Sequence, residues 1–285
     1  MRFSILAIAS AIAVFAVSAS PVSISKRSAS TDILNFALTL EHLESTFYKE
    51  GLAKFSQKDF EKAGYHGKVR EYFEHIGEHE NTHVDLLTSI IKSLHETPVP
   101  VCKYNFPLTD VDAFIAISRA LENTGVSAYL GASSSLAGGL LTTAGTITTV
   151  EARQSSYLNT LVGGEGTPYN FDTPLTAQEV FTMASGFIVS CPYNVGVKPY
   201  TQLTASVNKN SSKVATSFKG KGAKNEWCQF LFSNQVVVSP RSKCTVPKEV
   251  NGYFYVVITD TKTPLTAKDG AHIVAGPALL FEGDH

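Results

Sequence analysis

Several motifs that identify common enzyme classes are absent from this 285-residue sequence. It contains no glycine-rich phosphate loop, no G-x-S-x-G nucleophile elbow, no H-E-x-x-H zinc motif and no acidic loop with calcium-binding spacing. A formal net charge of −1 gives no basic footprint for nucleic acid or an anionic membrane. The function must therefore be sought in residues that are dispersed along the chain.

Apolar stretches long enough to span a bilayer are also absent. One shorter apolar run, Ile5–Val17, follows a basic residue and ends at small residues, which is typical of a secretory signal peptide. We expect a signal peptide over residues 1–19, a propeptide or linker over residues 20–30, and secretion to the extracellular space or the cell wall. The dibasic pair Lys26 and Arg27 either marks a processing site for a Golgi protease or is an ordinary solvated pair.

Cysteine is scarce, with four residues and no C-x-x-C spacing, so a cysteine metal site is not indicated. In an oxidising compartment the four cysteines are expected to form disulfides. Cys228 and Cys244 flank two predicted strands, while Cys102 and Cys191 each follow a helical segment and precede a proline-bearing turn. These positions favour the pairs Cys102–Cys191 and Cys228–Cys244. Asn210 begins the only N-glycosylation sequon, in a polar stretch where a glycan would fit.

The composition, 44% hydrophobic and 17% charged, predicts a globular fold in two parts. The apolar spacing is helical over residues 31–192 and changes to period two over residues 199–285. We therefore expect an α+β multidomain protein, with a four-helix bundle and a short fifth helix followed by a small β-sandwich. The expected helices are Asp32–Glu50 stopped by Gly51, Lys68–Leu94, Thr109–Leu130, Thr146–Leu161, and a fifth that starts at Thr176 and ends before Cys191.

Each of the four long predicted helices carries a glutamate in the middle of its apolar stripe. These residues are Glu41, Glu80, Glu122 and Glu151. A buried carboxylate costs several kcal/mol unless it is paired, hydrogen-bonded or bound to a metal. His83 lies three residues after Glu80, which places an imidazole beside that carboxylate one helical turn away. Four inward carboxylates in this arrangement match the di-metal four-helix bundle.

The first two helices also resemble the third and fourth. Glu41 and Glu122 are each followed seven residues later by a tyrosine, Tyr48 and Tyr129 respectively. The second and fourth helices share a glutamate followed three residues later by histidine or glutamine. The same comparison aligns Glu44 with a glycine, so Glu41 is the primary ligand candidate of the first helix and Glu44 is an additional one.

Four segments resemble the ferritin-like domain of secreted fungal stress-response proteins, to which plant and bacterial desiccation-related proteins are related. In order, they are ALTLEHLESTFY, EHENTHV, RALENTGVSAYLGA and TVEARQSSYL. The resemblance covers about residues 31–192, and the β-rich tail is similar to the C-terminal part of the fungal members. It implies a bundle core that binds iron or manganese, with a redox or stress-protective role. The ligand positions that it implies are Glu41, Glu80, His83, Glu122 and Glu151.

The resemblance also implies roles for these side chains. Glu80 and Glu151 would bridge two metals, and Glu41 and Glu122 would be terminal carboxylates. Tyr48 and Tyr129 would donate hydrogen bonds to ligand carboxylates. Carboxylate and imidazole ligands of this kind suit iron or manganese.

Gln154 is the one departure from the family pattern, because it occupies the position where many relatives have a second histidine. A neutral glutamine oxygen is a weaker ligand than imidazole, so we expect the second metal position to bind less tightly. A di-metal oxidase or peroxide enzyme, a single bound metal and a metal-free polar core all stay open. In the last case Glu41, Glu122, Tyr48, Tyr129 and Gln154 would form a hydrogen-bond network.

Two other readings of the chain remain. His75, His79 and His83 repeat every four residues, so His79 and His83 are an alternative metal pair at the surface. The bundle could also be a scaffold for a cell-wall or extracellular interaction module that binds its partner through the β-domain. Ferritin-type storage is disfavoured, because an appended sandwich should obstruct a closed shell.

Overall fold

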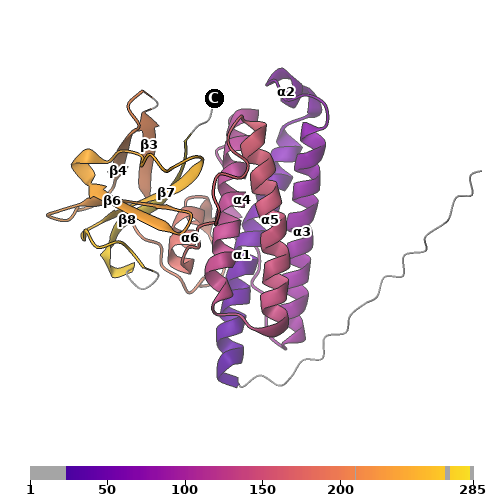
Figure 1. The fold of residues 1–285 in the computed structure, drawn as a ribbon. Coiled ribbons are helices and arrows are strands. Elements are labelled where there is room, and N and C mark those ends of the chain that lie inside the picture. Colours follow the sequence, from indigo (N-terminus) through magenta and orange to yellow (C-terminus); the bar gives the residue numbers. More distant parts are fainter. Residues whose placement is uncertain (1–23, 209, 267–269, 283–285) are drawn as a thin grey trace, which may run out of the picture.

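The computed structural model describes residues 24–208, 210–266 and 270–282 (Figure 1). Four long helices form a bundle: α1 (Ile24–Lys54), α3 (Val69–Ser93), α4 (Val111–Ser133) and α5 (Gly138–Leu161). Helix α1 packs mainly on α3, and α4 packs mainly on α5. Two shorter helices are α2 (Gln57–Lys62) and α6 (Ala177–Ala184), and α6 lies between the bundle and the β-strands (Figure 1). Within the described ranges, no helix combines the length and apolar character needed to cross a membrane.

The N-terminal predictions are only partly covered by these residues. The expected signal peptide, residues 1–19, lies outside them. Within the expected linker of residues 20–30, the chain is already helical from Ile24, so Lys26 and Arg27 lie in the first turn of α1. The predicted start at Asp32 is therefore wrong. No glycine or proline occurs between Ile24 and Asp32, so nothing in that stretch interrupts the helix.

The predicted stop of the first helix at Gly51 is also wrong, since α1 continues to Lys54. Gly51 has another role. A Cβ atom at this position would lie 2.2 Å from Cε2 of Phe114 on α4. The glycine therefore lets the backbone of α1 contact a buried aromatic ring, a contact that any larger residue would block.

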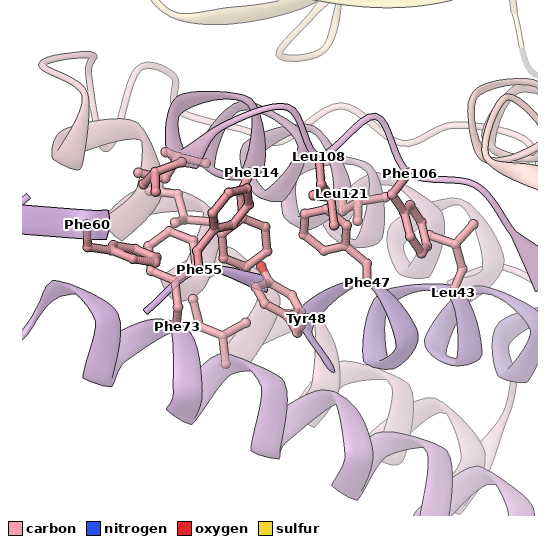
Figure 2. Packing of buried hydrophobic residues seen from close by; sticks show 14 of the residues in the cluster. Leu43, Phe47, Tyr48, Phe55, Phe60, Phe73, Phe106, Leu108, Phe114 and Leu121 are labelled. Carbon is pink, nitrogen blue, oxygen red and sulfur yellow. The ribbon is translucent and has the colours of Figure 1, made fainter. Parts of the chain in front are cut away.

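Phe114 is at the centre of an aromatic cluster that fills one end of the bundle (Figure 2). Its ring centroid lies 5.0 Å from that of Phe47 and 5.2 Å from that of Phe73. Phe60, from the short helix α2, closes this end and is fully buried. The other end of the bundle has an aliphatic cluster that includes Leu34, Leu38, Leu87, Ile91 and Ile147. The bundle thus has two apolar cores, one at each end.

The fourth bundle helix begins earlier than expected, at Gly138 rather than Thr146. The small and polar residues before Thr146 gave little indication of a helix. Ala144 is buried there, and Leu136 and Leu140 pack on the aliphatic cluster. Tertiary packing therefore outweighs weak local propensity in these first turns. Asp110 caps α4 by accepting a hydrogen bond from the Ala113 amide (2.8 Å), and Thr176 and Glu179 form a capping box at the start of α6.

The C-terminal part contains two antiparallel sheets. One is a hairpin of β3 (Leu203–Asn208) and β4 (Lys213–Phe218). The other has the order β6–β5–β7–β8, formed by β5 (Trp227–Phe232), β6 (Gln235–Pro240), β7 (Tyr253–Thr259) and β8 (Ile273–Phe281). Short 3₁₀ helices η1 (Arg241–Lys243) and η2 (Gly270–His272) connect strands. The expected fold class, a helical bundle followed by a β-sheet region, is confirmed.

Strand β7 is buried along its whole length, which the period-two pattern did not predict. On one face, Phe254 and Val256 pack with the β3–β4 hairpin. On the other face, Tyr255 and Val257 pack with Val180 of α6 and with residues of the bundle. The tyrosine hydroxyl of Tyr255 also hydrogen-bonds to the Asn123 carbonyl of α4 at 3.1 Å. The larger sheet therefore shares an apolar core with the helices.

Both disulfides join the cysteine pairs expected from the sequence, Cys102–Cys191 and Cys228–Cys244. The first lies beside a small sheet of β1 (Lys103–Tyr104) and β2 (Ile188–Ser190), which the sequence did not indicate. The second connects β5 to the segment after η1. Asn210 is exposed in the turn between β3 and β4, and its glycosylation stays a prediction.

Candidate metal centre

The four stripe glutamates lie at the same level of the bundle, between the two apolar cores. On α1, Glu41 follows Leu38 of the aliphatic cluster and precedes Phe47 of the aromatic cluster. On α5, Glu151 likewise follows Ile147 and precedes Leu158. Because helix periodicity places each glutamate on the inward face, the four carboxylates meet in the middle of the bundle. All four are buried.

Four ligand-type side chains converge at one point: Glu41 of α1, Glu80 and His83 of α3, and Glu151 of α5. One ligand atom from each lies within 4.8 Å of the other three. The His83 Nδ1 atom is 3.1 Å from Glu80 Oε2, 3.3 Å from Glu41 Oε2 and 3.8 Å from Glu151 Oε1. A cation held by these atoms would have three carboxylates and one imidazole around it.

The two tyrosines of the internal repeat hydrogen-bond across it. Tyr48 of α1 donates to Glu122 Oε1 of α4 at 2.5 Å. Tyr129 of α4 donates to Glu41 Oε1 of α1. Each tyrosine therefore holds the glutamate of the other half of the repeat. The hydrogen bond fixes the Oε1 atom of that glutamate and does not involve its Oε2 atom. Hydrogen bonds of this kind orient metal ligands.

Glu122, the fifth ligand candidate, is not part of the four-residue cluster. Tyr48 holds its Oε1 atom, and Oε2 is buried without a hydrogen-bond partner among the described residues. Glu44 is also buried, at 5% exposure, and the charges of Glu80, Glu41 and Glu122 act on it. Glu122 and Glu44 thus lie outside the four-residue cluster but interact electrostatically with it.

The cluster leaves buried oxygens without donors. Within the described ranges, neither oxygen of Glu151 has a hydrogen-bond partner, and Oε2 of Glu41 has none with suitable geometry. His83 Nδ1 carries at most one hydrogen and already bonds Glu80 at 3.1 Å. Leaving a buried carboxylate unpaired is expensive, and a bound cation removes that cost. The residues present therefore fit a metal ion.

Gly125 makes room for Glu151. A Cβ atom on this residue of α4 would lie only 2.1 Å from Glu151 Oε2. Gly125 falls on the inward stripe of its helix, where the internal repeat has Glu44. The comparison of the two halves of the bundle used this glycine to rank Glu44 below Glu41. It did not reveal that the carboxylate of Glu151 occupies the space where a side chain at position 125 would lie.

Gln154 lies at the edge of the cluster. Its Nε2 atom donates to Glu80 Oε1 at 3.0 Å and lies 3.3 Å from Nδ1 of His79. Its Oε1 atom is buried without a partner among the described residues. His79 is exposed, and so is His75. The contact between His79 and Gln154 joins the surface histidines to the buried cluster, which the histidine spacing alone did not predict.

The electrostatics of the cluster favour positive charge. Burial lowers the pKa of His83, but the neighbouring carboxylates of Glu41 and Glu80 overcome this and raise the pKa to about 10. Burial raises the pKa of Glu80 to about 7, although the His83 contact opposes the shift. Burial and neighbouring glutamates also hold the pKa of Glu122 and Glu151 well above the usual range. In the metal-free protein, protons supply the positive charge that this site attracts.

Comparison with known proteins places the helical part in a family. Residues 29–164 match the family of the ferritin-like domain. The chain is also similar to Protein rds1 of Schizosaccharomyces pombe, with 30% identity over 162 residues. That alignment covers 56% of this chain and 39% of rds1, so the chain matches well under half of the length of this relative.

Proposed function

Residues 29–164 form a ferritin-like domain, and from this premise we propose that the bundle core binds iron or manganese. Glu41, Glu80, His83 and Glu151 would hold the metal. Glu122 and Glu44 are the carboxylates that would complete a second position. Three carboxylates with one imidazole form a mostly hard oxygen set, which suits these two metals better than a thiolate-selecting ion.

The observation that carries this proposal is the state of Glu151. Its carboxylate is 0% exposed, and both oxygens lack a hydrogen-bond partner among the described residues. A metal-free hydrogen-bond network accounts for one oxygen each of Glu122 and Glu41, since Oε1 of each accepts from a tyrosine. It does not account for Glu151, which accepts from none. A cation is the simplest partner for that carboxylate.

The surrounding side chains would prepare the site for its metal. Tyr129 fixes Glu41, and Gln154 holds Glu80 through Oε1, which leaves Glu80 Oε2 beside His83. The two apolar clusters flank the carboxylates on both sides along the bundle. When bound, iron or manganese would supply one-electron chemistry toward oxygen or peroxide.

A stress-related or redox role in a secreted protein is the biological setting that we propose. The family resemblance supports the role, and the two disulfides fit an oxidising compartment. Gln154 supports a weaker second metal position, because an amide oxygen is neutral. A di-metal oxidase requires two bound metals, whereas a single bound metal is compatible only with simple binding or with single-metal chemistry.

The test is the metal content of protein purified from its native secretion route. We expect bound iron or manganese in the wild type and a large loss of it in Glu151→Gln, which keeps the size of the side chain but removes its charge. Glu78→Gln is the matched control, because Glu78 is exposed on the helix that carries Glu80. Equal metal content in wild type and Glu151→Gln would refute the proposal. An oxygen- or peroxide-consumption assay on metal-loaded protein would then separate catalysis from binding.

A second function is supported by a different observation. The larger β-sheet packs on the bundle through α6, so the helices could serve as a scaffold that presents the β-strands to a cell-wall or extracellular partner. Under this alternative the site holds no metal. Wild-type protein that lacks metal after purification, and still folds with an unchanged melting temperature in Glu151→Gln, would favour it.

A further inference from the structure

An apolar pocket extends into the bundle as far as the acidic cluster. It is a pocket of about 590 Å³ between α1, α3, α4, α5, α6 and the loop 193–197. The walls are mainly aliphatic, with Leu34, Leu87, Leu136, Leu140, Ile147 and Val180. Pockets of this size and character bind small apolar molecules. We propose that this pocket binds an apolar molecule with a single neutral hydroxyl head, an alcohol or a phenol, whose head reaches Glu44.

The pocket is long and has one wet end. Asp32, Ser135 and Asn194 line it and are exposed, whereas Glu41 and Glu44 line it and are buried. Asp32 and Glu44 are both on α1, twelve residues apart, so the pocket follows that helix for roughly 18 Å. An elongated ligand can therefore enter at the surface and place its far end beside the carboxylates.

Small residues of α4 line the pocket. They are Gly125, Ala128, Gly131 and Ala132, which span two turns of the helix. Across from α4, the first two turns of α5 supply Leu140, Thr143 and Ala144. This is the stretch whose small and polar residues gave no helical prediction, and its helical form provides a wall of the pocket.

The loop that closes the pocket is held in place by specific bonds. Tyr193 donates to the Thr39 hydroxyl of α1 at 2.9 Å. Two residues earlier, Cys191 is joined by its disulfide to Cys102. The pocket wall is thus fixed by a covalent link as well as by hydrogen bonds, as expected for a binding site that is formed before its ligand arrives.

Glu44 identifies the head group. Its side chain is 5% exposed and lines the inner end of the pocket, and no described residue hydrogen-bonds to its carboxyl group. A hydroxyl can both donate to and accept from a carboxyl group, so it satisfies Glu44 in either protonation state. A carboxylate head, as in a fatty acid, would lose its hydration there and would find no cationic side chain among the described residues that line the pocket.

The inference that this ligand is the substrate of the metal site rests on the proposed function. Binding of the ligand in the pocket can be measured without metal. The probe is the neutral dye N-phenyl-1-naphthylamine, added to the metal-stripped full secreted chain at pH 7. We expect saturable fluorescence from one site, displaced by 1-decanol and at least tenfold less well by decanoate. Equal displacement by decanoate would overturn the assignment of the head group.

Two neighbouring threonines give a matched pair of variants. Thr143 lines the pocket, whereas Thr142 is exposed and does not. Thr143→Phe should fill the pocket and weaken dye binding at least tenfold, and Thr142→Phe should bind like wild type. If Thr143→Phe does not fold, Ala132→Leu on the opposite wall serves the same purpose. Wild-type dye affinity in whichever of Thr143→Phe and Ala132→Leu is folded would show that the dye does not bind in this pocket.

Glu44→Gln tests the head group separately. It should reduce the preference for 1-decanol over decanoate, because a glutamine amide can donate a hydrogen bond to a carboxylate. An unchanged preference would show that Glu44 does not contact the head. Because all these titrations use metal-free protein, dye and alcohol binding by a chain that never acquires metal would support the pocket and its ligand class, and would refute the metal proposal together with the role of that ligand as its substrate. Metal binding by a chain that does not bind the dye would support the metal proposal and refute the pocket ligand.

Discussion

Replacing Gly125 by alanine is the sharpest test of the metal centre, because it changes the site by a single methyl group. The added Cβ would lie 2.1 Å from Glu151 Oε2, well inside van der Waals contact. The carboxylate must therefore move by about 1 Å, whereas metal-ligand distances tolerate only about 0.2 Å. Glu151 cannot keep both its place and its ligand geometry.

The expected size of the effect follows from two opposing terms. Alanine is more favourable than glycine inside a helix by about 0.5–1 kcal/mol, whereas overpacking against Glu151 costs about 1–3 kcal/mol, so metal-free Gly125→Ala should lose at most about 2.5 kcal/mol of unfolding free energy. Its metal affinity should fall at least about tenfold, which corresponds to about 1.4 kcal/mol of binding free energy. The metal-induced rise in stability should shrink accordingly.

Gly145→Ala is the matched control. Gly145 lies inside α5 and is exposed, and nothing lies within 4 Å of the position of its Cβ. This variant should gain about 0.5–1 kcal/mol in stability and bind metal like wild type. The assay is urea unfolding of metal-free protein, followed by manganese titration with electron paramagnetic resonance detection of the free ion. Wild-type manganese affinity in Gly125→Ala would refute the assignment of Glu151 as a ligand.

Three further outcomes are expected. Gly51→Ala should destabilise the fold by about 1–3 kcal/mol in urea unfolding, because its Cβ would lie 2.2 Å from the buried Phe114 ring, and it should leave the metal content unchanged; a stabilised variant would contradict the close contact. Burial raises the pKa of Glu80 to about 7, so its contribution to metal-free stability is fully present below its ordinary value of 4.5 and is lost as the pH rises through 7. The urea midpoint should fall from pH 5 to pH 8, less steeply in Glu80→Gln, and equal slopes would contradict this. Gln154→His should raise the metal content per chain measured by elemental analysis, and no increase would mean that Gln154 does not adjoin a second metal position.

The residues that make up the site illustrate what helical spacing can and cannot specify. Glu41, Glu80, Glu122 and Glu151 each interrupt an apolar stripe, and an inward position on an amphipathic helix leads directly to burial. Spacing along one helix says nothing about which atoms of different helices converge. In the folded chain Glu122 is held by Tyr48 outside the four-residue cluster, although the repeat makes it equivalent to Glu41.

The sequence by itself determined the class of fold, the inward carboxylates and the disulfide pairs, because each depends on periodicity or on local order along the chain. Only the tertiary structure decided that Tyr48 and Tyr129 hold each other's glutamates, and that Gly51 and Gly125 are glycines because another helix fills the space beside them. It also decided the apolar pocket, whose walls come from five helices and a loop. Such features depend on distances between elements far apart in sequence, and these distances are set only when the helices pack.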